Sequence, residues 1–394
     1  MDNQQSFDYI IAGAGASGMS LLWQLLHSED ESIRNSSILL VDRTLKPTSD
    51  KTWCFWDDSR IPFPDLIHHT WHTLEISANE STFTEQLDKY RYHCIRSIDF
   101  SEKLINLARN CPNVTLLETD IHGYKTADGS AILETGNGDY RAGWIFQSAL
   151  KPPGYFRSKS DISLLQHFLG WEIELKNPVL DPGKAVLMDF DVPQGNGVSF
   201  IYLLPYSETS ALIEYTLFSS AVISDEDYEA GLRYYLDHKM KLNPEDYSIT
   251  RIEKGVIPME DQRYPALYCG RVVNTGTMGG LTKPSTGYTF TRIQKQVRRI
   301  VKDLEEGRDP VHSGESEYRF RVYDMMLLWL LREHPETSII IFRELFSRNR
   351  FDRILTFLEE NTSIPQELGI FSSLPYVPFF RSIWHMKHRI LTGA

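Results

Sequence analysis

The first 42 residues contain the pattern that most constrains the fold of this 394-residue chain. An apolar run of strand type, DYIIA, leads directly into the glycine-rich turn GAGASG and then into an apolar segment, MSLLWQLLH, that reads as a helix. A second apolar run, SILLVD, ends in an acid. This order predicts the βαβ unit that opens a Rossmann-like α/β domain, with a dinucleotide bound at the turn.

The small residues of this turn have mechanical roles. Gly13 makes the tight turn, Gly15 lets the backbone approach a pyrophosphate, and Gly18 lets the helix and the strand pack closely. The start of the helix offers free N–H groups to phosphate oxygens, and the acid after the second strand is placed to accept hydrogen bonds from a ribose. The predicted cofactor-binding residues of this unit are Gly13, Ala14, Gly15, Ala16, Ser17, Gly18 and Asp42.

Charge and cysteine usage exclude several classes of protein. The formal net charge is −12, so a general electrostatic attraction to nucleic acid is not expected. The four cysteines are scattered without a CxxC pair, which argues against a structural zinc site and for reduced thiols in the cytoplasm. We therefore predict neither a metal nor a nucleic-acid partner.

The sequence shows no pattern of a signal peptide or a membrane span. The N-terminus, MDNQQSFDYIIAG, passes from polar residues directly into a strand, without the basic stretch and apolar core of a leader. The longest apolar run, Met325 to Leu331, is far shorter than the roughly 20 residues that cross a bilayer. We therefore expect a cytoplasmic protein that does not span a membrane.

A second glycine-rich turn lies nearly three-quarters of the way along the chain. The segment RVVNTGTMGGLTKPSTGYTF reads as a strand at Val272 to Thr275, followed by turn glycines and by a basic helix from about Thr289. Flavoproteins commonly close their dinucleotide domain with such a strand, turn and helix, and the second turn would then face the same cofactor from the other side. An ordinary strand–loop–helix connection is the alternative, which composition alone leaves open.

The residues between the two turns are predicted to form segments inserted into the dinucleotide-binding domain. An amphipathic helix is predicted over 97–110, followed by short strands with a hairpin at the Gly-Asn-Gly of 136–138. After the Lys-Pro-Pro-Gly of 151–154, the runs AVLMDF, SFIYLLPY and SALIEYTLFS predict strands of a second, sheet-based domain. A helix is expected over 225–240, and the chain is largely helical from about Arg298 onward.

Seven motifs give the chain a resemblance to the bacterial lycopene β-cyclases, a family of enzymes in carotenoid biosynthesis. They are the N-terminal fingerprint, KTWCFW at 51–56, QHFLGWEIE at 166–174, LMDFDVPQ at 187–194, IEYTLFS at 213–219, EKGVIPM at 253–259 and GGLTKPSTGYTF at 279–290. The resemblance implies an FAD-dependent isomerase that closes the ψ ends of lycopene into β-ionone rings, giving γ-carotene and then β-carotene. It also implies that NAD(P)H reduces the flavin, without net oxidation of the substrate.

The resemblance sets the expected architecture as well. It implies an FAD-binding Rossmann-like domain of the glutathione-reductase or hydroxylase type, formed by residues 1–153 and 263–300. Residues 154–262 would form an inserted β-sheet substrate domain, and residues 301–394 a helical C-terminal region. In the second turn, the implied cofactor-binding residues are Gly279, Gly280, Lys283 and Ser285.

Ring closure requires an acid that protonates a C=C bond of the substrate. An alkene is a very weak base, so the acid must be a carboxyl group that an apolar pocket keeps protonated. Glu214, in the apolar run ALIEYTLF, is the candidate catalytic residue, and the family motif has its acid at the matching position. The alternative is a carboxyl that points to solvent from a half-exposed strand. Many relatives have two adjacent acids here, whereas this chain has Tyr215 in second place.

The resemblance is looser at other positions. KTWCFW begins with Lys51 where relatives usually have arginine or histidine, so a guanidinium contact to the cofactor is not implied. Asp42 stands where glutamate is common, and either acid can hold the ribose. A reduced, anionic flavin would stabilise cationic intermediates, and aromatic faces would add cation–π attraction. Possible lining residues are Tyr202, Tyr206, Tyr215, Trp53 and Trp56.

Lycopene is an apolar polyene, so the enzyme must collect it from a membrane. A weak peripheral contact with the inner face of the cytoplasmic membrane is expected, through the helix MMLLWLLREH at 325–334 or the tail FFRSIWHMKHRI at 379–390. Two other functions stay open: an FAD-dependent monooxygenase or prenyl reductase acting on an isoprenoid, and a flavin- or carotenoid-binding protein without activity. The sequence also leaves open the choice between NADH and NADPH and the oligomeric state.

Overall fold

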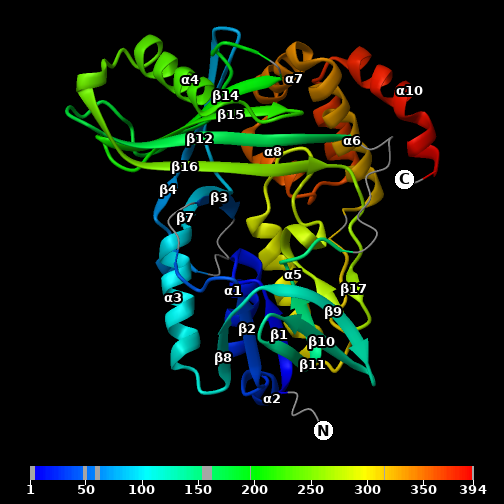
Figure 1. Ribbon diagram of the computed structural model, residues 1–394. Helices are drawn as coiled ribbons and strands as arrows, with labels where there is room; N and C mark the ends of the chain where they lie inside the picture. The colour runs from blue at the N-terminus through cyan, green and yellow to red at the C-terminus, as the bar shows by residue number, and fades with distance from the viewer. Residues whose placement is uncertain are drawn as a thin grey trace.

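The computed structural model describes residues 5–47, 51–57, 63–152, 162–195, 197–314 and 316–392. Within these ranges the chain forms two large β-sheets with a small sheet between them, and helices cover the large sheets (Figure 1). The C-terminal helices lie beside the second large sheet, far from the N-terminus. The predicted α/β class is confirmed.

The first sheet has eight strands and contains the N-terminal βαβ unit. Its strands are β1 (Ser6–Ala12), β2 (Ile38–Asp42), β8 (Val114–Glu118), β9 (Ile121–Ala127), β10 (Ser130–Thr135), β11 (Gly138–Gln147), β17 (Leu267–Cys269) and β18 (Val272–Asn274). β1 is parallel to its neighbours β2 and β11, and β11 is also parallel to β18. The late strand predicted before the second turn therefore joins the sheet of the N-terminal unit.

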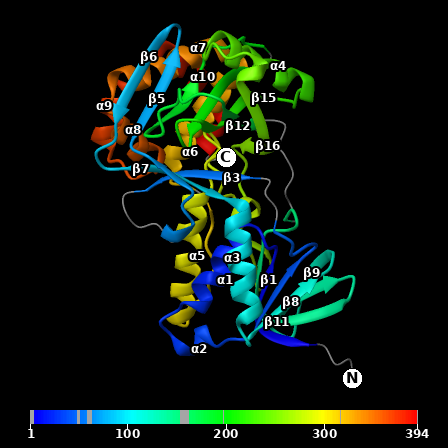
Figure 2. The same ribbon diagram turned by 90° about the vertical axis from the view of Figure 1, so that its left-hand side faces the viewer.

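Both faces of the first sheet are covered, so its central strands are almost entirely apolar. One face packs against α1 (Ala16–Leu26), α3 (Ser97–Asn110) and α5 (Phe290–Glu305), which lie together in Figure 2. Side chains of β9 and β10 contribute to the core on the opposite face. The short helix α2 (Glu31–Arg34) precedes β2. The predicted helix at 97–110 and the hairpin at 136–138 are both confirmed.

The second sheet has seven strands in the order β16-β12-β15-β14-β13-β5-β6. Their bounds are β5 (Thr73–Ala78), β6 (Ser81–Gln86), β12 (Ser163–Leu175), β13 (Lys184–Asp189), β14 (Val198–Pro205), β15 (Ser210–Ser219) and β16 (Tyr247–Glu260). β5 and β13 are parallel, and all other neighbours in this sheet are antiparallel. Helix α4 (Asp225–His238) packs on one face. The predicted strands and this helix are confirmed.

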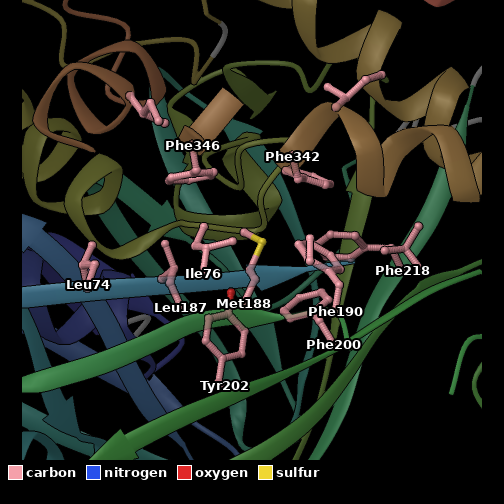
Figure 3. Packing of buried hydrophobic residues seen from close by; sticks show 14 of the residues in the cluster. Leu74, Ile76, Leu187, Met188, Phe190, Phe200, Tyr202, Phe218, Phe342 and Phe346 are labelled. Carbon is pink, nitrogen blue, oxygen red and sulfur yellow. The ribbon is translucent and has the colours of Figure 1, made fainter. Parts of the chain in front are cut away.

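The other face of the second sheet packs against the C-terminal helices. Phe190, Phe200 and Tyr202 lie under Phe342 and Phe346 of α7 (Figure 3), and the Phe190 and Phe342 rings stack with centroids 5.3 Å apart. The helices are α6 (Tyr318–Glu333), α7 (Pro335–Arg348), α8 (Phe351–Leu358), α9 (Ile364–Phe371) and α10 (Tyr376–Thr392), which confirms the helical C-terminal region. Among the described residues, no helix combines the length and the apolar character needed to cross a bilayer.

The sheets differ from the predicted division of the chain in one respect. β5 and β6 fall within residues 1–153 but belong to the second sheet, because β5 pairs with β13. Leu74, Ile76 and Ala78 alternate along β5 and are buried in the core of that sheet. The chain therefore crosses to the second sheet and returns before α3. The predicted boundary between residues 153 and 154 lies outside the described residues.

A three-stranded antiparallel sheet connects the two large sheets. It is formed by β3 (Thr52–Asp57), β7 (Arg91–Arg96) and β4 (His69–Trp71), and three 3-10 turns complete the fold: η1 (Pro64–Leu66), η2 (Pro244–Asp246) and η3 (Gly276–Gly279). β3 packs against α5, and its first residue, Thr52, is hydrogen-bonded to Glu253 of β16. This contact links the KTWCFW segment directly to the second sheet.

Candidate active site

A cavity of about 410 Å³ lies where the three sheets meet. Its walls come from the start of α1, from β3 and β7, from four strands of the second sheet, and from the segment between η3 and α5. Both glycine-rich turns contribute to these walls, the first through Gly15 and Ala16 and the second through Gly287. The fold thus brings the two turns of the sequence to one space.

The first turn has the geometry of a phosphate-binding loop. Gly13 has a φ of +113°, and a Cβ atom on Gly18 would lie 1.9 Å from the Gly13 carbonyl oxygen, so both positions require glycine. Within the described ranges, a Cβ atom on Gly15 would meet nothing within 4 Å, and no side chain caps the start of α1. Ser17 Oγ is buried without a hydrogen-bond partner in the described part of the chain. Open N–H groups at a helix start fit the phosphates of a dinucleotide.

Asp42 ends β2 beside this turn. Its Oδ2 atom accepts a hydrogen bond of 2.6 Å from the backbone N–H of Ala14, and this contact holds the turn in place. An acid at the end of the second strand is where a dinucleotide-binding fold contacts the ribose. The ribose contact of Asp42 stays a prediction.

The second turn packs directly on the first. Gly276 has a φ of +60°, and a Cβ atom on it would lie 2.9 Å from Ser17 Cβ. Gly280 has a φ of +74°, and a Cβ atom on Gly279 would lie 2.6 Å from the Asn274 carbonyl oxygen. These glycines bend the backbone so that the threonines that follow them, Thr277 and Thr282, face the cavity. Gly279 and Gly280 shape the bend without lining the cavity, and their contact with a cofactor stays a prediction.

Lys283 and Ser285 lie on the other side of this turn. Lys283 Nζ is 3.0 Å from Asp324 Oδ1 and 2.8 Å from Glu360 Oε1, and Ser285 Oγ donates to Asp324 Oδ1 at 2.6 Å. The Lys283 side chain is buried, so its charge needs these carboxylates. The two residues attach the turn to α6 and do not line the cavity, and their contact with a cofactor stays a prediction.

Glu214 belongs to a row of residues that crosses four strands of the second sheet. Its register partners are Tyr202 on β14 and Gly170 on β12, and Gly170 pairs in turn with Glu253 on β16. Tyr202 and Glu214 line the cavity, and Glu214 is only 9% exposed. A Cβ atom on Gly170 would lie 2.7 Å from Glu214 Cγ, so the glycine leaves room for the carboxyl group. This burial excludes a carboxyl that points into solvent.

The surroundings of Glu214 favour its neutral form. Among the described residues, none is hydrogen-bonded to its carboxyl group, so no donor stabilises the anion. Burial raises the pKa of Glu214 well above its ordinary value, the nearby charge of Glu253 raises this pKa further, and Arg251 lowers it. This setting favours the protonated carboxyl, the form that an acid acting on an alkene needs.

Tyr215 faces the opposite side of the sheet from Glu214. Its ring packs in the core under α4, where a Cβ atom on Gly231 would lie 2.7 Å from it, and its hydroxyl donates to the Pro193 carbonyl oxygen at 3.2 Å. Successive side chains of a strand point to opposite faces. A second acid at this position would therefore not reach the cavity.

Aromatic rings form much of the cavity wall. Of the aromatic residues considered from the sequence, Trp53 and Tyr202 line the cavity, whereas Trp56, Tyr206 and Tyr215 do not. The sequence reasoning missed four further lining residues: Tyr92, Phe168, Tyr288 and Phe290. Tyr288 and Phe290 stand in the motif of the second turn and Phe168 stands in QHFLGWEIE, but nothing local to these motifs marks a ring that lines the cavity.

Three of the lining tyrosines interact with one another. The hydroxyl oxygens of Tyr92 and Tyr288 are 3.2 Å apart, and the hydroxyl groups of Tyr202 and Tyr288 influence each other's pKa. Burial raises the pKa of each of these phenols, which are therefore neutral. Neutral rings offer π faces to a cation without a phenolate that would attack it.

A second buried carboxyl, Glu253, lies at the end of the Glu214 row and was not expected from the sequence. Its side chain is 2% exposed and accepts hydrogen bonds from Thr52 N at 2.6 Å and Thr52 Oγ1 at 2.7 Å. Arg251 Nη1 donates to it at 2.9 Å. The sequence signal was the lone acid of EKGVIPM, and its position beside Glu214 depends on strand register.

Comparison with protein families gives a match over nearly the whole chain, because residues 8–384 match the family model described as "Lycopene cyclase protein". The chain belongs to the lycopene cyclase family. The resemblance inferred from the seven motifs is confirmed.

Relatives in the lycopene cyclase family are distant in sequence but similar in length. A lycopene β-cyclase from Pseudescherichia vulneris is 26% identical over 357 residues, which cover 84% of this chain and 86% of the relative. A lycopene β-cyclase from Paracoccus sp. (strain N81106 / MBIC 01143) is 25% identical over 405 residues, which cover 98% of each chain. The likeness therefore extends along the whole protein.

Solved structures share the fold of this lycopene cyclase family member at low identity. A flavoprotein/dehydrogenase from Cytophaga hutchinsonii has a TM-score of 0.61 and 12% identity, over 94% of this chain and 99% of that one. A geranylgeranyl bacteriochlorophyll reductase-like protein from Thermoplasma acidophilum has a TM-score of 0.56 and 14% identity, over 98% and 100%. The halogenase PltM, solved with FAD, has a TM-score of 0.59 and 12% identity, over 90% and 82%. The predicted flavoprotein fold is confirmed.

Proposed function

We propose that this protein is a lycopene β-cyclase that converts the ψ ends of lycopene into β-ionone rings, through γ-carotene to β-carotene, with FAD as its cofactor. The observation that carries the proposal is Glu214, a buried carboxyl without a hydrogen-bond donor among the described residues, in a cavity of aromatic rings. Membership of the lycopene cyclase family supports the choice of substrate.

The two turns supply a binding site that fits FAD. The open N–H groups at the start of α1 would hold its phosphates, and Asp42 would hold its ribose. Gly279 and Gly280 would keep the second turn close to the bound cofactor, whereas Lys283 and Ser285 anchor that turn to α6. Reduced by NAD(P)H, the bound flavin would supply a negative charge beside the cavity and leave the redox state of the substrate unchanged.

Glu214 is the acid in this mechanism. Its carboxyl proton is transferred to C2 of the ψ end, where the π electrons of C1=C2 form the new C–H bond and leave a cation at C1. The π electrons of C5=C6 then form the C1–C6 bond and leave a cation at C5. The C6–H bond electrons restore C5=C6, and the Glu214 carboxylate accepts the C6 proton. Each ring therefore returns Glu214 to its acid form.

The aromatic wall assists the cationic steps. The rings of Tyr92, Tyr202 and Tyr288 are neutral and lie in the same cavity as the acid. A cation over such a ring gains about 1–2 kcal/mol where water is excluded. The absence of a phenolate removes a nucleophile that would otherwise trap the C1 or C5 cation.

A membrane contact through α9 and α10 completes the proposal. The described residues of these helices expose many large apolar side chains: Ile364, Leu368, Tyr376, Val377, Phe380, Ile383, Trp384 and Leu391. The sequence of α10 contains basic residues and no acid. The alternative segment on α6 is mostly buried, at Met325, Leu328, Trp329, Leu330 and Leu331. We infer that α10 holds the protein at the inner face of the cytoplasmic membrane.

The proposal is tested with purified protein, reduced FAD and lycopene in lipid vesicles, without oxygen. The wild type is expected to yield γ-carotene and then β-carotene. Glu214→Gln is expected to retain bound flavin and to lose at least 99% of the activity, by the usual contribution of a catalytic acid. Glu174→Gln, which changes an exposed acid on β12, is the matched control and keeps full activity.

Two outcomes would contradict the proposal. Unchanged lycopene from the flavin-loaded wild type would mean that the protein binds a flavin or a carotenoid without cyclising it. A product that appears only with oxygen, or that has gained hydrogen, would mean a monooxygenase or a prenyl reductase. Full activity of Glu214→Gln would reject only the assignment of Glu214 as the acid.

A further inference from the structure

Glu214 and Glu253, the two buried carboxyls in the row that crosses the second sheet, have different surroundings. Glu214 and Glu253 are separated by Gly170, which has no side chain to screen one from the other. Two strand spacings correspond to roughly 10 Å between their Cα atoms. Two carboxyls that are this close and this deeply buried do not both ionise readily, so their surroundings decide which one is charged.

Burial raises the pKa of Glu253, whereas its hydrogen bonds from Thr52 and Arg251 lower this pKa and favour the ionised form. Thr52 N and Arg251 Nη1 are donors only, at 2.6 and 2.9 Å from its oxygens. The Thr52 hydroxyl accepts a hydrogen bond of 2.9 Å from Arg251 Nη2, so its own proton points to Glu253 Oε2 at 2.7 Å. Every partner of Glu253 therefore donates, which only a carboxylate can satisfy fully.

Other groups around Glu214 do not compete with this charge. Tyr202 on β14 and Tyr92 on β7 are buried, Cys54 on β3 and Tyr288 before α5 are half-buried, and desolvation favours the neutral form of each. Among the described residues, the charged groups that act on Glu214 are Glu253 and Arg251, both on β16.

Arg251 is directed away from the acid by its own partners. Its Nε atom donates to Glu172 at 2.8 Å, and its two other nitrogens contact Glu253 and Thr52. Arg251 pairs in register with Glu172, two positions along the strands from the Gly170–Glu253 pair in the row of Glu214. Its positive charge is therefore shared between two carboxylates, and Glu253 is the charge in line with Glu214.

We propose that the Glu253 carboxylate, held by Thr52 and Arg251, is a positioning residue that keeps the carboxyl group of Glu214 protonated. This inference rests on the proposed function, in which Glu214 is the acid. It explains why the KTWCFW segment, through Thr52, reaches across to β16: the contact fixes a negative charge in the row of the acid. Glu253 needs no contact with the substrate for this role.

The direct test is the protonation of Glu214 in the full chain without substrate. The carbonyl stretch of its protonated carboxyl is the infrared band that disappears in Glu214→Gln. In Glu253→Gln, we expect this band to be lost at a pH about one unit lower than in the wild type. Glu253→Asp keeps the charge and is expected to keep the wild-type titration. Glu253→Met is a second neutral variant. If Glu253→Gln does not fold, Glu253→Met is expected to show the same shift of the band.

The activity gives a second readout. With reduced FAD and lycopene, the rate of Glu253→Gln is expected to fall off on the alkaline side at a pH about one unit lower than the rate of the wild type. Glu253→Asp is expected to have the pH profile of the wild type. A Glu214 band that titrates as in the wild type in both neutral variants would overturn the inference. An inactive wild type with the expected band shift would instead reject the proposed function and leave the electrostatic coupling established.

Discussion

The carboxyl group of Glu214 lies between Tyr202 and Gly170 in the row that crosses the second sheet, and its burial has a cost that depends on pH. Its folded-state pKa is raised above the ordinary value of 4.5. For a group with a raised pKa, the contribution to stability is fully present below the unfolded pKa and is lost as the pH rises through the folded value.

This sign gives a prediction for the stability of Glu214→Gln. The free energy of unfolding of the variant, relative to the wild type, is expected to rise with pH above about 4.5, by roughly 1.4 kcal/mol for each pH unit up to the folded pKa. Urea unfolding at a series of pH values measures this difference. Glu174→Gln, at an exposed position, is the control. Parallel pH profiles of the wild type and Glu214→Gln would show that the carboxyl is not buried as described.

At the residue scale, the sequence predicted the identity of the acid but not its partner. Glu214 was recognisable as a lone acid in an apolar strand run of a family motif. Glu253 is equally lone in its own motif, but its relation to Glu214 comes from the register of three strands, which are far apart in sequence. Local pattern does not encode such a register, so this part of the site could not be predicted.

At the scale of elements, ion pairs on the side away from the cavity hold the second turn in place. The Lys283 side chain is 5% exposed, and its ammonium group lies between Asp324 of α6 and Glu360, which follows α8. A buried cation without its partners, or carboxylates without their cation, carries an uncompensated desolvation cost. The ion pair therefore fixes the turn on the C-terminal helices while its other side faces the cavity.

We expect Lys283→Met to lower the free energy of unfolding by about 3–5 kcal/mol, because it leaves the buried carboxylate of Asp324 without its cation. Chemical denaturation measures the loss. Lys295→Met is the matched control, since Lys295 is half exposed and pairs with Glu359 beside the same helix end. Its expected loss is below about 1 kcal/mol. Equal losses in the two variants would contradict the anchoring role.

The element scale also shows where sequence reasoning succeeds and where it stops. Strong local patterns predicted the N-terminal βαβ unit, α3 over 97–110 and the hairpin at 136–138. The side of the second turn on which Lys283 lies depends on its partners in α6 and after α8, which are distant in sequence. The membership of β5 in the second sheet is likewise set by its pairing with β13, which local pattern does not contain.

For the whole molecule, the apolar surface of α9 and α10 is the feature that distinguishes one end of the protein from the rest. Phe380 is 66% exposed and Trp384 is 68% exposed, and Lys387 lies over the Trp384 ring at 4.0 Å. The protein as a whole has a net charge of −12, so a general attraction to anionic lipid is not expected. Membrane contact therefore depends on this surface.

We expect Phe380→Ser together with Trp384→Ser to lower the partition of the protein into anionic lipid vesicles by about ten- to a hundredfold, from the loss of two apolar side chains. Vesicle co-sedimentation measures the partition, and circular dichroism checks the fold. The control is Val222→Ser together with Ile252→Ser, which are exposed apolar residues outside α9 and α10. Similar losses in both double variants would assign the contact to another surface.

The central claim is that a neutral Glu214 carboxyl gives a proton to C2 of the lycopene end. Cyclisation in D₂O by the flavin-loaded protein tests it most directly, because an exchanged carboxyl carries deuterium. The account predicts one deuterium at C2 of the ring that each exchanged Glu214 closes in its first turnover, and no cyclised product from Glu214→Gln with its flavin bound. First-turnover rings without deuterium at C2, or labelled rings formed by Glu214→Gln at the wild-type rate, would contradict it.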